Sequence, residues 1–133
     1  MNRSLAAVAY LAPDYDAAIA FFRDALGFAL VEDQDLGDGK RWVVVAPNHA
    51  RGAALVIAKA SDARQIAAIG EAAGGRVAYF LETDDFARDY ESFAARGVKF
   101  LEAPRREPYG VVAVFIDAFG VKWDLLQRTE PAA

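Results

Sequence analysis

The chain of 133 residues contains no cysteine and only one histidine, His49. The absence of cysteine excludes disulfide bonds, thiolate metal sites and a cysteine nucleophile. His49 lies in a predicted loop next to Pro47 and Asn48, so the sequence predicts no Ser-His-Asp arrangement for nucleophilic catalysis. A phosphate-binding glycine loop is also missing, because the Gly-Asp-Gly-Lys run at residues 37–40 joins two predicted strands and is typical of a hairpin turn.

Positive charge does not dominate the sequence: 15 Lys and Arg stand against 19 Asp and Glu, which gives a net charge of −4. Nucleic acids and anionic membranes attract clustered positive charge. No apolar run reaches the roughly 18 residues that a membrane-spanning helix needs, and residues 1–10 lack the pattern of a secretion signal. We therefore expect a soluble, cytoplasmic, globular protein that binds neither nucleic acid nor membrane.

The sequence does contain a regular alternation of apolar strands and amphipathic helices. In the first half, residues 5–11 form an apolar run that predicts a buried strand. Asp14 then precedes a predicted helix, and Gly27 is placed to end it. The apolar stripe of this helix recurs at helical spacing and consists of Tyr15, Ile19, Phe22 and Leu26. Three further strands are predicted, at residues 28–36, 41–46 and 53–60.

The second half repeats this order after a predicted helix at residues 61–73. Residues 76–83 predict a strand, Asp84 or Asp85 precedes a second helix, and Gly97 closes that helix. Its apolar stripe consists of Phe86, Tyr90 and Phe93. Strands are again predicted three times, at residues 98–103, 110–116 and 121–127.

A shift of 70 residues aligns the helix boundaries of the two halves, pairing Asp14 with Asp84 and Gly27 with Gly97. We interpret the halves as duplicated βαβββ modules. One module alone buries only one face of its sheet, so the two sheets must pair, or the chain must pair with a second copy. The predicted fold is α+β, with paired mixed sheets forming a cup and the helices on its convex side. The first module, the connecting helix and the second module span residues 4–60, 61–75 and 76–128 of a single domain at 1–133.

Two stretches resemble the vicinal oxygen chelate superfamily, which contains glyoxalase I, bleomycin-resistance proteins and extradiol dioxygenases. Residues 13–22, followed by Leu26-Gly27-Phe28, are similar to the opening helix of that family. Residues 117–125, Asp-Ala-Phe-Gly-Val-Lys-Trp-Asp-Leu, resemble its closing turn and last strand. Residues 83–86 and 107–110 are similar to a bacterial glyoxalase-like subgroup. The resemblance implies the duplicated fold, a small-molecule ligand and a homodimer.

The resemblance also implies metal ligands at four strand positions, and this chain carries only one of them. The histidine positions are Ala7 and Val77, the carboxylate of the fourth strand falls near residues 54–56, and the last carboxylate is Asp124. One carboxylate does not make a metal site, so we expect no metal and no other cofactor. A weaker alternative is a metal held by His49, Glu82 and Asp124, although His49 is interpreted first as a solvated loop residue.

Strand alternation places candidate site residues in the predicted cup. If Val77 faces the cup, so do Tyr79 and Leu81, whereas Glu82 faces away and is interpreted as a surface carboxylate. Asp124 would face inward with Lys122 and Leu126, while Trp123 and Leu125 pack under the helices. One prediction for Asp124 is that it anchors a ligand or acts as a base, with Tyr79 as a second acid–base group. The alternative is that it forms a structural ion pair with Lys122, Arg41 or another nearby cation.

Three further residues are candidates for ligand binding. Arg105 and Tyr109 lie in a predicted hairpin tip that either closes over an anionic or aromatic ligand or is a solvated tip protecting a sheet edge. Trp42 either lines the cup or packs in the core or against a second subunit, and packing is the favoured interpretation.

The pattern as a whole predicts a metal-free protein that binds a small apolar or aromatic molecule in a cupped pocket, as in the bleomycin-resistance branch. The alternative is a lyase or dioxygenase-type enzyme acting on a small oxygenated substrate, with Asp124 and Tyr79 as catalytic residues. The sequence leaves open whether the protein catalyses a reaction.

Overall fold

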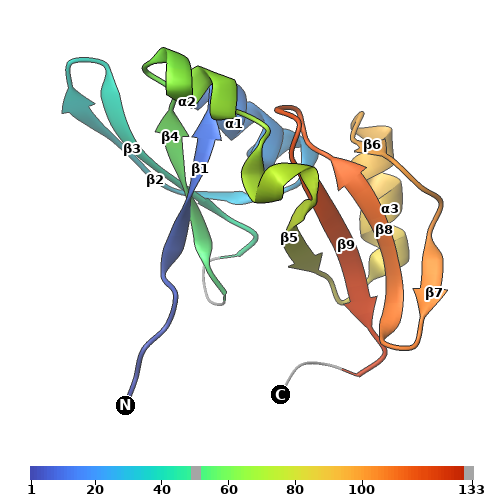
Figure 1. Ribbon diagram of the computed structural model, residues 1–133. Helices are drawn as coiled ribbons and strands as arrows, with labels where there is room; N and C mark the ends of the chain where they lie inside the picture. The colour runs from blue at the N-terminus through green and yellow to red at the C-terminus, as the bar shows by residue number, and fades with distance from the viewer. Residues whose placement is uncertain (49–51, 131–133) are drawn as a thin grey trace. The chain divides into compact units, whose positions relative to one another are not determined.

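The computed structural model describes residues 1–48 and 52–130, so His49 lies outside the described residues. The chain divides into two compact units, one ending at Ile69 and the other beginning at Gly70. Each unit is described by itself below, with the element labels of Figure 1.

The first unit is a four-stranded mixed sheet with a helix between its first two strands. The strands lie in the order β1-β4-β3-β2, with β1 parallel to β4 and the other neighbours antiparallel. A second short helix, α2, follows the sheet. In chain order the elements are β1 (Ala7–Ala12), α1 (Tyr15–Ala20), the π-helical turn η1 (Phe21–Ala25), β2 (Ala29–Gly37), β3 (Lys40–Ala46), β4 (Ala54–Lys59) and α2 (Ala63–Ala68).

The second unit repeats this plan. Its strands lie in the order β5-β9-β8-β6, with β7 also paired to β8, and β5 runs parallel to β9 as β1 does to β4. The predicted α+β fold with a βαβββ repeat is thereby confirmed. In chain order the elements are η2 (Ala72–Gly75), β5 (Val77–Glu82), α3 (Phe86–Ala95), β6 (Lys99–Phe100), β7 (Arg105–Glu107), β8 (Gly110–Ile116) and β9 (Lys122–Arg128).

The helix boundaries follow from the side chains that the sequence places there. Asp14 accepts a hydrogen bond from the Ala17 amide at 2.9 Å, and Asp85 accepts one from the Arg88 amide at 3.1 Å. Each carboxylate thus satisfies an amide that has no partner within its helix. Gly27 follows the first helical segment with a φ of +72°, a conformation that glycine adopts without steric cost.

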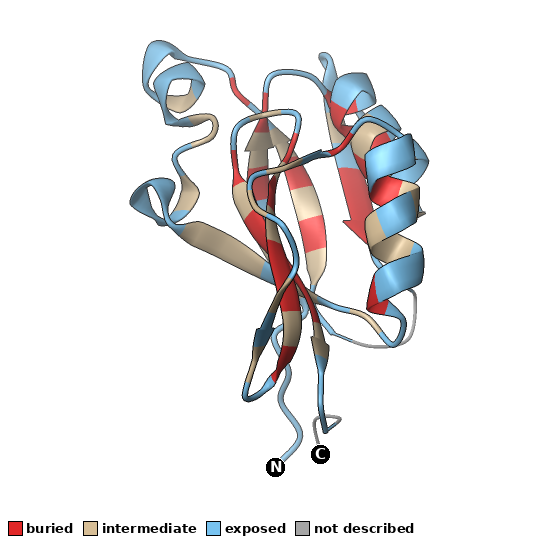
Figure 2. Cartoon of the chain, turned by 90° about the vertical axis from the view of Figure 1, so that its right-hand side faces the viewer, coloured by how far each residue is buried: buried red, intermediate tan, exposed pale blue. Residues whose placement is uncertain are grey.

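The core of each unit lies between its sheet and its helices, and Figure 2 shows the buried residues concentrated on the strands while most of each helix is exposed. In the first unit Tyr10 packs edge-to-face on Phe22, with ring centroids 5.1 Å apart. In the second unit Phe115 stacks on Trp123 at 5.8 Å and meets Phe93 of α3 edge-to-face at 5.7 Å. These aromatic residues, from the strands and from the helices that cover them, form the apolar core that stabilises each unit.

Two sequence predictions about the elements were wrong. The helix expected at residues 61–73 stops at Ala68, because Ile69 is extended and Gly70 has a φ of +82°. A Cβ at Gly70 would lie 2.6 Å from the Phe119 carbonyl oxygen, so a side chain does not fit at the position where the second unit begins. The strand expected at 98–103 is reduced to β6, and the expected turn that follows it contains the short strand β7.

The approach of Gly110 to β9 gives a first prediction. A Cβ at Gly110 would overlap the carbonyl oxygen of Gln127, whereas a Cβ at Gly97 meets nothing within 4 Å. We expect Gly110→Ala to lower the free energy of unfolding by about 3 kcal/mol, because β8 must move away from β9. The control Gly97→Ala has only its φ of +88° to overcome and is expected to lose about 1 kcal/mol. Urea denaturation measures both, and equal losses would contradict the proposed clash.

Candidate functional site

Among the described residues, the buried charged side chains are Asp117 and Asp124, and both belong to the segment that forms the last hairpin. The oxygens of Asp117 accept hydrogen bonds from the amides of Phe119 and Val121, at 2.9 and 3.0 Å, and from Trp123 Nε1 at 2.9 Å. These donors compensate the burial of the carboxylate. Asp117 is therefore a structural residue that holds the turn between β8 and β9.

Asp124 is buried in a different way. It is 9% exposed, and its Oδ1 has no hydrogen-bond partner among the described residues. Burial raises the pKa of Asp124, an effect that the positive charge of Arg105 opposes and the negative charge of Glu102 reinforces. Within its unit Asp124 forms no ion pair with Lys122 or another described cation, and Arg105, whose charge acts on its pKa, is itself paired with Glu102 and Glu107. This buried oxygen therefore has an unused capacity to accept a hydrogen bond.

The strand register places Asp124 on the face of the sheet opposite the helical core. Asp124 pairs with Phe80 of β5 on one side and with Val114 of β8 on the other. Lys122 and Leu126 share its face, while Trp123 and Leu125 point to the helical side, as the alternation of β9 predicts. The side chain of Asp124 thus stands in the middle of an apolar row formed by Phe80 and Val114.

Tyr79 does not join Asp124, and the prediction that the two side chains share a face was wrong. An irregularity between Val77 and Tyr79 shifts the register of β5, so that Tyr79 pairs with Trp123. The two rings lie 4.7 Å apart on the helical side, where burial raises the pKa of the Tyr79 hydroxyl. One inserted residue reverses the facing of every later side chain in a strand, which brings Phe80 beside Asp124 in place of Tyr79.

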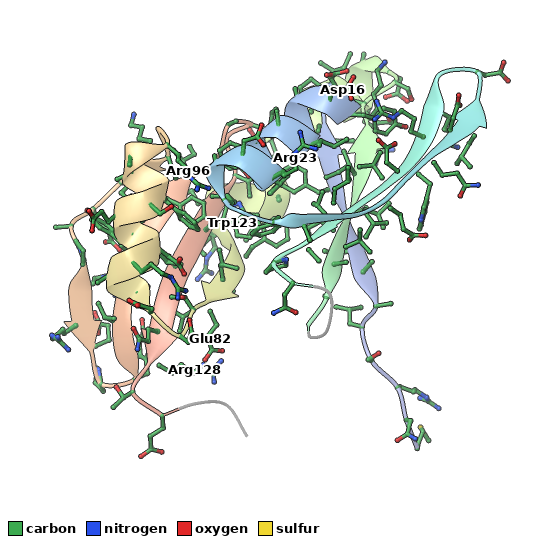
Figure 3. The ribbon with its side chains drawn as sticks, turned by 180° about the vertical axis from the view of Figure 1, so that it is seen from behind. Asp16, Arg23, Glu82, Arg96, Trp123 and Arg128 are labelled. Carbon is green, nitrogen blue, oxygen red and sulfur yellow. The ribbon has the colours of Figure 1, made fainter. Side chains whose placement is uncertain are left out.

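The same shift changes the surroundings of Glu82. As predicted, Glu82 faces away from Tyr79, but this is the face that carries Asp124. Its carboxylate forms an ion pair with Arg128, with Oε1 3.4 Å from Nε, at the far ends of β5 and β9 (Figure 3). Glu82 is thus an exposed, ion-paired residue at the border of this face.

Arg105 and Tyr109 lie on the Asp124 side of the second unit. Arg105 pairs in register with Val112 on this face and donates hydrogen bonds to Glu102 at 3.0 Å and Glu107 at 2.7 Å. Tyr109 forms a further side-chain hydrogen bond with Arg105 and is 48% exposed. The structure therefore brings three of the sequence-predicted site residues to one face: Asp124, Arg105 and Tyr109.

A hollow of about 500 Å³ lies on this face, within the range typical of small-ligand pockets. Its apolar lining includes Phe80 and Leu101, which are 66% and 43% exposed. Neighbouring apolar side chains that are exposed to water are typical of ligand-binding grooves and interaction surfaces. Its other lining residues are Gly75, Arg76, Val77, Glu102, Val114 and Lys122. The sequence analysis did not identify Phe80 or Arg76 as site residues. Only the register shift in β5 shows that Phe80 borders Asp124, and only the tertiary structure places Arg76 at the hollow.

Trp42 belongs to the first unit and lies on β3. It is 41% exposed, so it is not a core residue of that unit, and its indole Nε1 donates to Glu32 at 3.0 Å. An exposed indole held by one hydrogen bond is a suitable surface for an aromatic ligand. Its predicted role in binding stays a prediction.

The residues present do not fit a metal ion at the positions that the family resemblance implies. Ala7 pairs directly with Ala54 in the first unit, and Val77 occupies the corresponding position on β5; none of these side chains has a donor atom. In residues 1–48 and 52–130, no three His, Cys, Asp or Glu side chains gather to hold a metal. The alternative site with His49 involves a residue outside the described ones. Among the described helices, none is long and apolar enough to cross a membrane.

A family model matches most of this chain. Residues 4–125 match the Glyoxalase/Bleomycin resistance protein/Dioxygenase superfamily, and the chain belongs to that superfamily.

Individual proteins are similar to this chain over nearly its whole length. An uncharacterized protein from Shewanella frigidimarina is 47% identical over 131 residues, which cover 98% of this chain and 97% of that protein. The crystal structure of UcmS2 is 27% identical, covers 95% of this chain and 98% of its own, and has a TM-score of 0.81. TnmS3, an antibiotic binding protein from Streptomyces sp. CB03234, is 28% identical over 97% of this chain and 99% of its own, with a TM-score of 0.72.

The unpartnered oxygen of Asp124 gives a second prediction. The pKa of Asp124 is 3.8 in the unfolded chain and higher in the folded protein, so the folded protein holds this proton to a higher pH. The free energy of unfolding therefore falls as the pH rises from 3.8 through the raised pKa. Asp124→Asn removes this loss and is expected to stabilise the protein by roughly 1 kcal/mol at pH 7. The gain should shrink as pH falls toward 4.

Urea denaturation at several pH values between 4 and 8 measures this difference. The control Asp84→Asn makes the same chemical change at an exposed carboxylate that is paired with Arg88, and it is expected to change stability by less than about 0.5 kcal/mol. A variant at position 124 that becomes less stable than the wild type as pH rises would contradict the raised pKa.

Proposed function

We propose that the protein binds a small, flat aromatic or otherwise apolar molecule on the Asp124 face of the second unit, without a metal. The observation that carries this proposal is the buried Asp124 Oδ1, which has no hydrogen-bond partner among the described residues. Leaving a buried acceptor unsatisfied costs roughly 1–3 kcal/mol. A ligand that donates a hydroxyl or amine hydrogen to this oxygen recovers that free energy.

The apolar part of the ligand is accounted for by the side chains around the carboxylate. Phe80 lies beside Asp124 in the sheet and is 66% exposed, and Leu101 is 43% exposed. Covering both removes apolar surface from water, which favours binding by roughly 25 cal/mol per Å². We place Arg105 and Tyr109 at the border of the bound ligand. The similarity to TnmS3, an antibiotic binding protein, supports a small organic ligand.

The hydroxyl of the ligand gives a third prediction. We expect 2-naphthol to bind about tenfold or more tightly than naphthalene, because a hydrogen bond to a charged acceptor contributes roughly 1.5–3 kcal/mol. In Asp124→Leu, which keeps the site apolar but removes the acceptor, both compounds should bind with nearly equal affinity. Isothermal titration calorimetry of the full chain measures the four dissociation constants.

Asp84→Leu is the control, because it removes an exposed carboxylate next to α3 and should leave the ratio of the two affinities unchanged. Thermal denaturation checks that both variants are folded. If the wild type binds neither compound, or if the preference for 2-naphthol persists in Asp124→Leu, the proposal is wrong.

A second candidate function is proton transfer, and the raised pKa of Asp124 favours it. A carboxylate that is destabilised by burial is a stronger base than one in water. Acting alone, without Tyr79 on its face, Asp124 would remove a proton from the carbon next to the carbonyl group of a hydroxyketone and return it.

Deuterium uptake from D₂O by 2-hydroxyacetophenone, followed by proton NMR, tests this candidate. An enzyme would accelerate the exchange over buffer at least about a hundredfold, and Asp124→Asn would abolish the acceleration. If the wild-type protein produces no exchange above buffer, the enzymatic candidate fails, while the binding proposal keeps its own test.

A further inference from the structure

We propose that the ligand of this hollow is an anion, and that Arg76 and Lys122 bind its carboxylate or other anionic group while Asp124 accepts its hydrogen-bond donor. This inference rests on the proposed function and specifies the class of ligand. Arg76 and Lys122 both line the hollow. The pairing of Val77 with Lys122 places them at the same end of the sheet, where the parallel strands β5 and β9 begin.

Arg76 and Lys122, the two basic residues that line the hollow, have no acidic partner among the described residues. In the second unit, Arg88, Arg105 and Arg128 each form an ion pair, with nitrogen–oxygen distances of 3.0, 2.7 and 3.4 Å. Neither Arg76 nor Lys122 forms an ion pair with any described residue. Their charges are therefore available to a ligand.

Glu102 also lines the hollow, but its carboxylate is paired with Arg105, which it shares with Glu107. Its Oε1 accepts hydrogen bonds from Arg105 Nε at 3.0 Å and from the Val114 amide at 3.1 Å. Glu102 is thus held toward β7 and β8, away from the end where β5 and β9 begin. The hollow consequently has a positive end, formed by Arg76 and Lys122. Asp124 does not line the hollow itself, but it borders two lining residues, Phe80 and Val114, further along β9.

The spacing along β9 sets the separation of the two polar groups on the ligand. Lys122 and Asp124 are two residues apart on the same face of one strand, which corresponds to about 7 Å. Phe80 lies beside Asp124 and provides an exposed ring for an aromatic body. These observations together favour an aromatic compound of about two rings, with an anionic group at one end and a hydroxyl or amine at the other.

The test compares 6-hydroxy-2-naphthoate with the uncharged 6-hydroxy-2-naphthamide, using calorimetry on the full-length protein. At low salt we expect the naphthoate to bind about fivefold or more tightly than the amide. Each exposed ion pair contributes only up to about 1 kcal/mol, and the carboxylate would form one with each of the two cations. The advantage should decline toward onefold in about 0.5 M NaCl because salt screens exposed charges. Arg76→Gln and Lys122→Gln should each reduce the advantage at least about twofold without weakening the amide.

Arg64→Gln on α2 is the matched control and should leave the advantage unchanged, and thermal denaturation establishes that all three variants are folded. Two outcomes would rule out the anionic ligand while the proposed binding function stands. In the first, the amide and 2-naphthol bind but the naphthoate binds no more tightly than the amide. In the second, the advantage of the naphthoate survives in both Arg76→Gln and Lys122→Gln. If none of the three compounds binds, the proposed function fails, and this inference fails with it.

Discussion

Burial of a carboxylate in an apolar environment raises the free energy of the folded state unless hydrogen-bond donors surround it. The last hairpin buries two of them. Asp117 receives two amide hydrogens and the indole hydrogen of Trp123, so it holds the turn that brings β9 back along β8. Asp124 lies further along β9 with one oxygen unpartnered. The protein itself thus satisfies the first carboxylate, whereas the second is buried with one oxygen that lacks a donor.

The position of Asp124 within the sheet explains why its carboxylate is buried. Its strand lies between β5 and β8, so Phe80 and Val114 border it on both sides. The helical side is closed by the aromatic cluster that contains Trp123 and Phe115. The proposed ligand would therefore reach Asp124 from the face that carries Phe80 and Val114.

Membership of the glyoxalase, bleomycin-resistance and dioxygenase superfamily defines the scaffold, but the chemistry depends on the residues at the site. In this chain the positions at which the resemblance implies metal ligands on β1 and β4 hold alanines that face each other, Ala7 and Ala54. At the hollow of the second unit, two cations without an ion pair, Arg76 and Lys122, lie on the face that also carries the buried Asp124. This arrangement is suited to recognising a polar pattern on a small molecule, and it is the basis of the proposals above.

The sequence by itself determined the features that depend on neighbouring residues. Asp14 and Asp85 cap helices through amides three residues away, and the period of two in β9 sets the face of Asp124. Only the tertiary structure decided that Tyr79 is replaced by Phe80 beside Asp124, that α2 ends before Gly70, and that Asp117 is satisfied while Asp124 is not. All three features depend on segments that are distant in the chain: the bulge in β5, the close approach of the backbone at Gly70 and the hydrogen-bond partners of the buried carboxylates. The local periodicity of a sequence does not encode which distant segment will pack against them.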